Sequence, residues 1–512
     1  MPTRTSGSWW SLLLSLAALG CEPERAPLDP ESATASPVCA GAEQMSRVWN
    51  PSVRDQLAAA LEQLPGEWPQ QLLASLDARM PAHAQHWTDS YEQACARQAN
   101  AALRCLDRRA WQLDATLGLI VDDPERTAAL WAALERGVDD PRACMDESGD
   151  APPELEWARG RELASLPLLL ELNEIAIVEP IVAELERDSV LSSAPRYALQ
   201  VALARAAVEQ AGGRREGALA AITLAVTYAE ALDPGARSAV ADASAKLAHA
   251  RGDRAATELA RAQAVAHARE QADAWLLVTQ LAEQGRSWIE HGEPARAVPL
   301  LAEAISIAGR LGGADNPATA ELQTILAQAQ LELGQIEPAH DALTQARDAF
   351  VIALGPDHPQ TLATVEAVGR LFVAAGQLGD AQFAFLDLLE IYGDLYGLDH
   401  WRTARIKLEL ADSLMAMDQH DSARTLYTEA LTPLARELGP VHPDVVRTSI
   451  HLGIAELALG NFEAAEPHCR RGRDLATALA PNDPLADEAE QCLARIAKEI
   501  AKATAKPSKK NR

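Results

Sequence analysis

Three histidines at equal spacing are the residues of this chain whose type and spacing come closest to a metal-binding set. His358, His400 and His442 recur at a constant interval along the sequence. Imidazoles bind a metal ion when several of them converge within a few Å. If the spacing reflects a stack of helix pairs, equivalent residues are separated by roughly 10 Å for each packed helix and cannot share one ion. We therefore predict that the three histidines mark repeat boundaries, and we expect no metal site.

The sequence contains no motif of a known catalytic chemistry. The HExxH pattern of zinc peptidases, the GxSxG nucleophile turn and the glycine-rich phosphate loop are all absent. The 73 acidic residues outnumber the 46 basic ones, which gives a net charge of −27, and no carboxylate pair stands out. Nucleic acid requires basic patches, so this charge balance excludes it as a partner. We predict a protein that is not an enzyme and carries no cofactor; cell-wall hydrolysis is the least favoured alternative.

The seven cysteines fit an oxidising compartment. Cys21 ends an apolar run, and the other six are Cys39, Cys95, Cys105, Cys144, Cys469 and Cys492. An even set in an exported chain is compatible with disulfide bonds, and none of them has the CxxC spacing of a zinc site. A helical hairpin after Asp123 would return Cys144 to Cys105, and Cys39 would then staple the helix that ends at Cys95. The other pairings of these four stay open. For Cys469 we expect a buried thiol, with a bridge to Cys492 as the alternative.

Residues 1–21 have the pattern of a signal peptide. Arg4 supplies a positive charge, and the apolar run from Trp9 to Leu19 is too short to span a bilayer. The run continues into Gly20 and Cys21, and this ending resembles the lipobox of bacterial lipoproteins. The resemblance implies lipidation of the Cys21 thiol, export and membrane anchoring. Glu22 favours the periplasmic face of the outer membrane over the inner membrane. An ordinary secretory signal with a chance cysteine is the alternative.

A regular period organises the C-terminal half of the chain. Phrases such as LGPDHPQT recur with anchors at Asn316, His358, His400, His442 and Asp483. A turn marker keeps the same period at Gly292, Gly334, Gly376, Asp418 and Gly460, with a small residue seven positions before it and a larger residue nine positions after it. Two antiparallel helices per repeat explain the columns, because the small residue admits the facing side chain and glycine accepts the left-handed turn. With 48% hydrophobic and 4% aromatic residues, the sequence predicts an all-α helical-repeat solenoid.

These columns resemble tetratricopeptide repeats (TPR) of the kinesin-light-chain type, most strongly over residues 275–480. The resemblance implies a TPR superhelix. Residues 39–150 resemble the segment that precedes such repeats in the non-kinase sensory region of myxobacterial serine/threonine-kinase-like receptors, on the basis of Trp49, Trp87, Cys95, Cys105, Arg109 and Cys144. The kinase motifs themselves are absent. We therefore expect the repeats to follow a small cysteine-containing helical domain.

The predicted segments run in order along the chain. A lipoprotein signal peptide (1–21) and a flexible, polar, proline-rich linker (22–38) precede the cysteine-containing domain (39–150). A degenerate helical pair (151–194) leads into repeats of about 40–42 residues (195–484). A capping helix (485–503) closes the stack, because a solenoid needs a polar outer face at its end. A basic, disordered tail (504–512) follows.

The first helix of each repeat is expected to line a concave groove. Counting back from the turn markers gives the predicted lining residues: Arg286, Glu321, Gln328, Glu366, Arg370, Arg405, Asp412 and Arg447. This polar lining of mixed charge suits a protein or an extended peptide better than a small ligand. We predict a membrane-anchored scaffold for protein–protein interaction in the bacterial envelope. The alternative is a sensor or adaptor subunit that binds an exported peptide or envelope component and couples to a kinase-like receptor.

Overall fold

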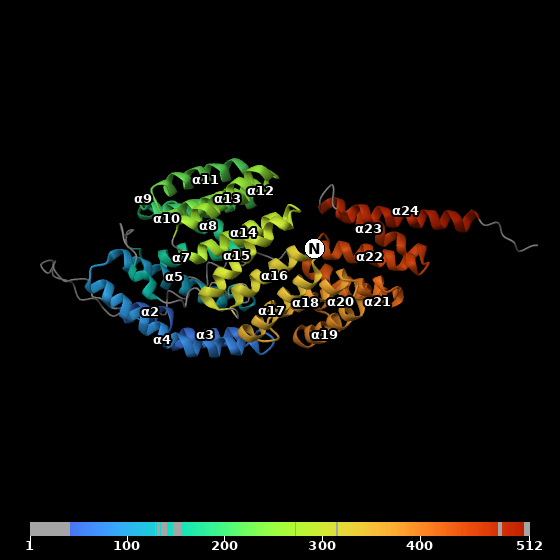
Figure 1. Ribbon diagram of the computed structural model, residues 1–512, viewed down its shortest axis with the longest axis horizontal. Helices are drawn as coiled ribbons and strands as arrows, with labels where there is room; N and C mark the ends of the chain where they lie inside the picture. Colours follow the sequence, from blue (N-terminus) through green and yellow to red (C-terminus); the bar gives the residue numbers. More distant parts are fainter. Residues whose placement is uncertain are drawn as a thin grey trace, which may run out of the picture. The chain divides into compact units, whose positions relative to one another are not determined.

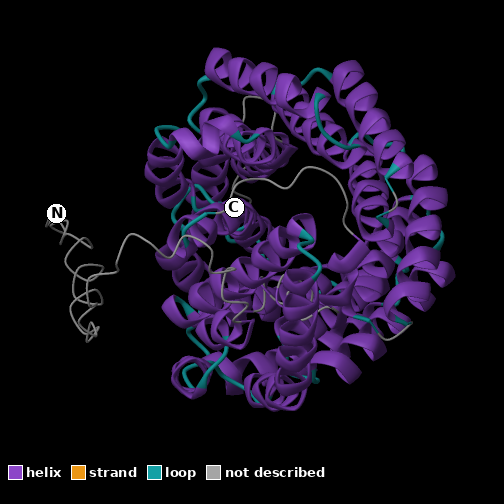
Figure 2. Cartoon of the chain, turned by 90° about the vertical axis from the view of Figure 1, so that its left-hand side faces the viewer, coloured by secondary structure: helices purple, strands orange, loops and turns teal. Residues whose placement is uncertain are grey.

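The computed structural model describes residues 41–127, 130, 134, 141–146, 155–271, 273–313, 316–479 and 484–505. Contacts divide the chain into Met1–Ala40 and Gly41–Arg512, and the description below concerns the second unit. The predicted signal peptide with Cys21, the linker, Cys39, the anchor Asp483 and most of the basic tail lie outside the described residues. Within the described part, every regular element is a helix (Figure 2). The expected all-α fold is therefore confirmed.

Helices of unequal length form the region before the repeats. They are α2 (Gly41–Val48), α3 (Pro51–Leu61), α4 (Trp68–Ala96), α5 (Asn100–Asp122) and the short 3-10 helices η1 (Pro124–Arg126) and η2 (Pro141–Asp146). Their core contains large buried side chains such as Trp87, Met80 and Leu106. A disulfide bond joins Cys105 on α5 to Cys144 on η2, which is the pair predicted from the sequence. Cys95 is also disulfide-bonded, and its predicted partner Cys39 is not among the described residues.

Helix pairs follow in regular order after α7 (Trp157–Glu171), α8 (Ile175–Leu185) and the short α9 (Ser189–Ser193) (Figure 1). The pairs are α10 (Pro195–Ala211) with α11 (Arg215–Glu230), α12 (Pro234–Ala250) with α13 (Arg254–Glu270), α14 (Ala274–Glu290) with α15 (Pro294–Gly312), α16 (Pro317–Glu332) with α17 (Ile336–Leu354), α18 (Pro359–Ala374) with α19 (Leu378–Tyr396), α20 (Trp401–Ala416) with α21 (His420–Leu438), and α22 (Pro443–Ala458) with α23 (Phe462–Leu479). The last helix is α24 (Pro484–Ala505).

The turn markers lie where the first helix of each pair ends. Each has a positive φ, from 59° at Asp418 to 81° at Gly460. Glycine adopts this conformation without steric cost, and aspartate tolerates it better than most residues. A second series of glycines with φ near 90°, from Gly313 to Gly439, ends the second helices. This second series was not among the predicted turn markers, although it recurs in the repeated phrases.

Small residues on the first helix of a pair admit large side chains from the second. A Cβ atom added to Gly369 would lie 2.7 Å from Cε1 of Phe385, and one added to Gly285 would lie 3.0 Å from Leu301. Such approaches leave no room for a side chain. The small and large columns of the sequence are therefore the two sides of one close helix contact, as the repeat pattern predicted.

The boundary histidines are helix N-caps. His358, His400 and His442 precede α18, α20 and α22, and in each the imidazole Nδ1 accepts the backbone N–H two residues further on, at 3.2 Å. This bond requires an unprotonated Nδ1 and satisfies one of the unpaired donors at the start of a helix. Burial lowers the pKa of His358 to about 3 and also lowers the pKa of His400. His358 and His400 therefore cap their helices in the neutral form.

Candidate functional site

The first helices of the pairs form the inner layer of the stack. Direct contacts join α14 to α16, α16 to α18, α18 to α20, α20 to α22, and α22 to α24. Within the described residues no contact of similar extent joins one second helix to the next. Because the first helices lie closer together than the second helices, they occupy the inner side of the curved stack. In Figure 1 they follow one another from yellow-green (α14) to red (α24). This layer carries all eight predicted lining residues.

Two of these residues form an exposed ion pair between successive first helices. The Arg286 guanidinium on α14 lies 2.6 Å from the Glu321 carboxylate on α16, and both side chains are about half exposed. Such surface pairs contribute little to stability, about 0–1 kcal/mol. Gln328, on the same helix as Glu321, is exposed. This part of the inner layer is therefore a solvated polar surface.

A second group, the α18–α20 group, consists of Glu366, Arg370 and Arg405. Glu366, which was predicted to line the groove, is itself buried with 1% exposure. Its carboxylate contacts Arg370 on the same helix and accepts a hydrogen bond from Arg405 on α20 at 2.7 Å. A buried carboxylate is costly unless it is paired, and two cations pair this one. The arginines themselves remain 46% and 37% exposed.

A third group, the α20–α24 group, consists of Glu409, Asp412, Arg447, His451 and Glu488. His451 on α22 lies between two acids: Nδ1 is 2.6 Å from Asp412 and Nε2 is 3.3 Å from Glu488 on α24. Arg447 donates to both Asp412 and Glu409 on α20. The group therefore connects three inner helices, including the one that closes the stack.

The pKa values of the α20–α24 group follow from its pairing. Burial lowers the pKa of His451, but hydrogen bonds and charge attraction from Asp412 and Glu488 outweigh it and raise the value to about 9. Burial raises the pKa of Asp412, and the bonds to His451, Arg447 and Tyr427 bring it below its usual range. His451 is therefore an imidazolium at neutral pH and donates from both nitrogens.

Three members of this group, His451, Glu488 and Glu409, were not predicted from the sequence. Their signal was a break in a column: Glu409 and His451 occupy equivalent positions of successive repeats, where the preceding repeats have the apolar Ile325 and Ala367. Two ionisable residues of opposite type in successive repeats, after two repeats with an apolar residue there, indicate a polar contact between repeats. Only the structure shows that α24 supplies the third partner.

A disulfide bond also holds α24. Cys469 on α23 is bonded to Cys492 on α24, and both are buried. The expectation that Cys469 is a buried free thiol was therefore wrong. The reason is that the closing helix packs against the face of α23 that carries the large column, so that Cys492 reaches the buried sulfur.

The region before the repeats contacts the start of α18. The indole of Trp68 on α4 meets the ring of His358 edge-on, with centroids 4.6 Å apart, and the Glu67 N–H donates to Asp357. Phe350 and Leu354 of α17 join the hydrophobic core of α2–α5. This contact explains why His358 is fully buried whereas His400 and His442 are partly exposed.

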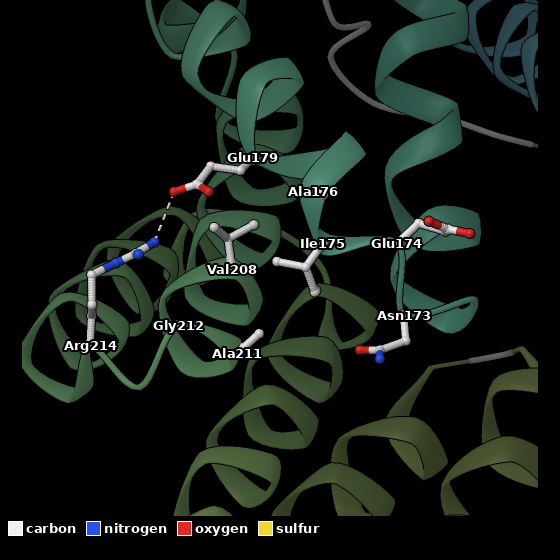
Figure 3. Close-up of a pocket in the computed structure, with 9 residues that line it drawn as sticks. All are labelled: Asn173, Glu174, Ile175, Ala176, Glu179, Val208, Ala211, Gly212 and Arg214. Atoms are coloured by element: carbon white, nitrogen blue, oxygen red, sulfur yellow. Dashed lines mark hydrogen bonds and ion pairs between the residues drawn. The ribbon is translucent and has the colours of Figure 1, made fainter. Parts of the chain in front are cut away.

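A separate shallow pocket of about 370 Å³ lies between the α7–α8 turn and the α10–α11 turn (Figure 3). Ile175, Val208 and Ala211 contribute apolar side chains to it. On its rim the Arg214 guanidinium pairs with Glu179 at 2.9 Å. The pocket includes none of the predicted lining residues.

Within the described residues there is no cluster of histidine, cysteine and acidic side chains arranged to hold a metal ion. In the same part of the chain, no helix combines the length and hydrophobicity that crossing a bilayer requires.

Comparison with known proteins identifies the repeats. Residues 290–350 and 402–478 match the tetratricopeptide repeat family. These two stretches therefore match tetratricopeptide repeats, a fold that generally serves as a non-catalytic scaffold for protein–protein interaction.

Similar proteins cover parts of the chain. A clustered mitochondria protein homolog from Lodderomyces elongisporus is 23% identical over 248 residues, which are 46% of this chain, and the chain spans only 17% of that relative. Kinesin light chain TPR-like repeats from Podosopora anserina are 23% identical, with a TM-score of 0.34, over 40% of this chain and 96% of that one. The apo form of RapI is 15% identical, with a TM-score of 0.49, over 74% of this chain and 99% of that one.

Proposed function

We propose that this protein is a membrane-anchored scaffold of the bacterial envelope that binds a protein or extended peptide along its first helices. The observation that carries the proposal is the inner layer itself. It presents a row of partly exposed, mutually paired charges, of which Arg286, Arg370 and Arg405 are each about two-fifths exposed. Side chains held in place by ion pairs bind at a lower entropic cost than free ones, which favours recognition of a partner segment.

A photo-crosslinking amino acid tests the binding surface in intact cells. Placed at Gln328 on the inner helix α16, it should yield a discrete crosslinked partner. Placed at Arg347, which is 41% exposed on the outer helix α17, it should yield none. Crosslinks at Arg347 without crosslinks at Gln328 would refute the assignment of the inner layer as the binding surface.

The membrane anchor is proposed from the sequence alone. Cys21 after the apolar run carries the lipid, and the polar linker that follows gives the repeats reach from the membrane. Palmitate labelling with membrane fractionation tests this by comparing the wild type with Cys21→Ser. Loss of both label and membrane association in the variant is expected. An unlabelled wild-type protein in the soluble fraction would refute the anchor and the envelope location together.

A sensor or adaptor role is the second candidate, and one contact favours it. The N-cap of helix α18, His358, contacts Trp68 on α4, and the same helix carries Glu366 and Arg370 two to three turns further on. A partner that shifts α18 would therefore act on α4. Hydrogen exchange of residues 68–96 with and without the crosslinked partner distinguishes the roles: a sensor changes exchange there, and a scaffold does not.

A further inference from the structure

The charges of the inner layer fall into groups of opposite sign. The α18–α20 group has two guanidinium cations and one carboxylate, so its net charge is +1. Its carboxylate, Glu366, is buried, whereas Arg370 and Arg405 reach solvent. A partner therefore meets cations there. This is a local exception in a chain whose net charge is −27.

The α20–α24 group has the opposite sign. It contains the carboxylates of Glu409, Asp412 and Glu488 against the cations of Arg447 and His451, so its net charge is −1 while His451 is protonated. Glu488 is its most exposed member, at 40%. The surface that a partner meets at this group is therefore acidic.

The spacing of the two groups follows from helix packing. Both include residues of α20; the α18–α20 group extends to α18, and the α20–α24 group extends to α22 and α24. Packed helices lie about 8–10 Å apart, and an extended chain advances about 3.3 Å per residue. The first group is centred between α18 and α20 and the second on α22, so they lie one and a half helix spacings apart, which equals about four residues of a bound strand.

We propose that the partner segment is an extended peptide with an acidic residue over the α18–α20 group and a basic residue three to five positions away over the α20–α24 group. This inference rests on the proposed function, because it names the partner chemistry of the same inner layer. Glu366 holds Arg370 and Arg405 through one nitrogen of each. A guanidinium has five N–H donors, so most of them remain to bind a carboxylate.

Selection of a random dodecapeptide phage library on the full-length protein tests the charge order. Enriched peptides should combine an acidic and a basic residue at a separation of three to five, with one order prevailing. Enrichment without this pair, or no enrichment over an unrelated acidic protein, would overturn the inference. The photo-crosslinks from Gln328 test the proposed function independently of the peptide selection. If the crosslinks form but the charge pair is not selected, the proposed function stands and only the charge order fails. If the crosslinks are absent as well, the proposed function fails too.

A double-mutant cycle on one selected peptide tests the contact itself. Arg370→Gln should weaken binding about tenfold, as expected for the loss of one charge-assisted hydrogen bond, and replacing the peptide's acidic residue with glutamine should abolish that difference. Arg347→Gln on α17 is the matched control and should leave binding unchanged. Equal losses from Arg370→Gln with the acidic and the glutamine peptide would overturn the inference. Arg370 is about half exposed and Arg405 still pairs Glu366, so this variant is expected to fold.

Discussion

Replacing His451 with glutamine should remove a pH-dependent contribution to stability. In the folded protein Asp412 and Glu488 raise the pKa of His451 to about 9, from its ordinary value of 6.5. Because the folded value lies above the unfolded one, folding favours the protonated form. The contribution is therefore complete below pH 6.5 and is lost as the pH rises through 9.

The size of the effect follows from the two pKa values. A pKa difference of about 2.5 at about 1.4 kcal/mol per pKa unit corresponds to about 3.5 kcal/mol. His451 is 20% exposed but Glu488 is 40% exposed, so solvent screening reduces the expected value to about 2 kcal/mol. Glutamine keeps a hydrogen-bonding group without the charge. At pH 6 we therefore expect His451→Gln to lower the free energy of unfolding by about 2 kcal/mol, and at pH 10 the variant should match the wild type.

Urea unfolding followed by circular dichroism between pH 6 and pH 10, with disulfides intact, measures the difference. Hydrogen exchange at pH 7 should locate the loss in α22 and α24. His468→Gln on α23 is the control, because burial lowers the pKa of His468, and its contribution is lost only as the pH falls below 6.5. A constant difference between wild type and His451→Gln across this range would refute the charged contact with α24.

Three further substitutions, two of them paired with a comparison variant, test the contacts that hold the repeats together. Gly369→Ala should lower the free energy of unfolding by about 1–3 kcal/mol, because the added Cβ would overlap the fully buried phenyl ring of Phe385. Gly379→Ala on the neighbouring helix is the control, because its added Cβ meets open space. In the same urea experiment it should raise the free energy of unfolding by roughly 0.5–1 kcal/mol. Trp68→Ala should cost about 3–5 kcal/mol and increase hydrogen exchange at the start of α18, while Trp68→Phe should cost less. Glu366→Gln should cost about 1–2 kcal/mol, because its two arginines lose their partner but turn into solvent; a measured gain in stability would contradict the pairing.

The repeats could be predicted from the sequence because their determinants are local. Each determinant acts within one helix pair: a glycine adopts a positive φ at the turn, a proline or histidine starts a helix, and a small residue lies opposite a large one. The constant period repeats these requirements, so columns in the sequence become helix contacts in the fold. The same local logic placed the eight predicted lining residues on the first helices of their pairs.

The pairing of those residues depended on tertiary structure. Glu366 and Asp412 were expected on the groove, but the column pattern does not show that two arginines make burial of Glu366 tolerable, or that Asp412 binds a histidine of the following repeat. The bond between Cys469 and Cys492 likewise depends on where α24 packs against α23.

The sequence by itself determined the helix pairs and their register, because each depends on backbone conformation and contact size within one repeat. Only the tertiary structure decided which charges meet, that Trp68 covers His358, and that α24 closes the stack through both an ion pair and a disulfide bond. These contacts join residues from different repeats or from outside the repeats. Their energies depend on distances and burial that no periodic pattern specifies.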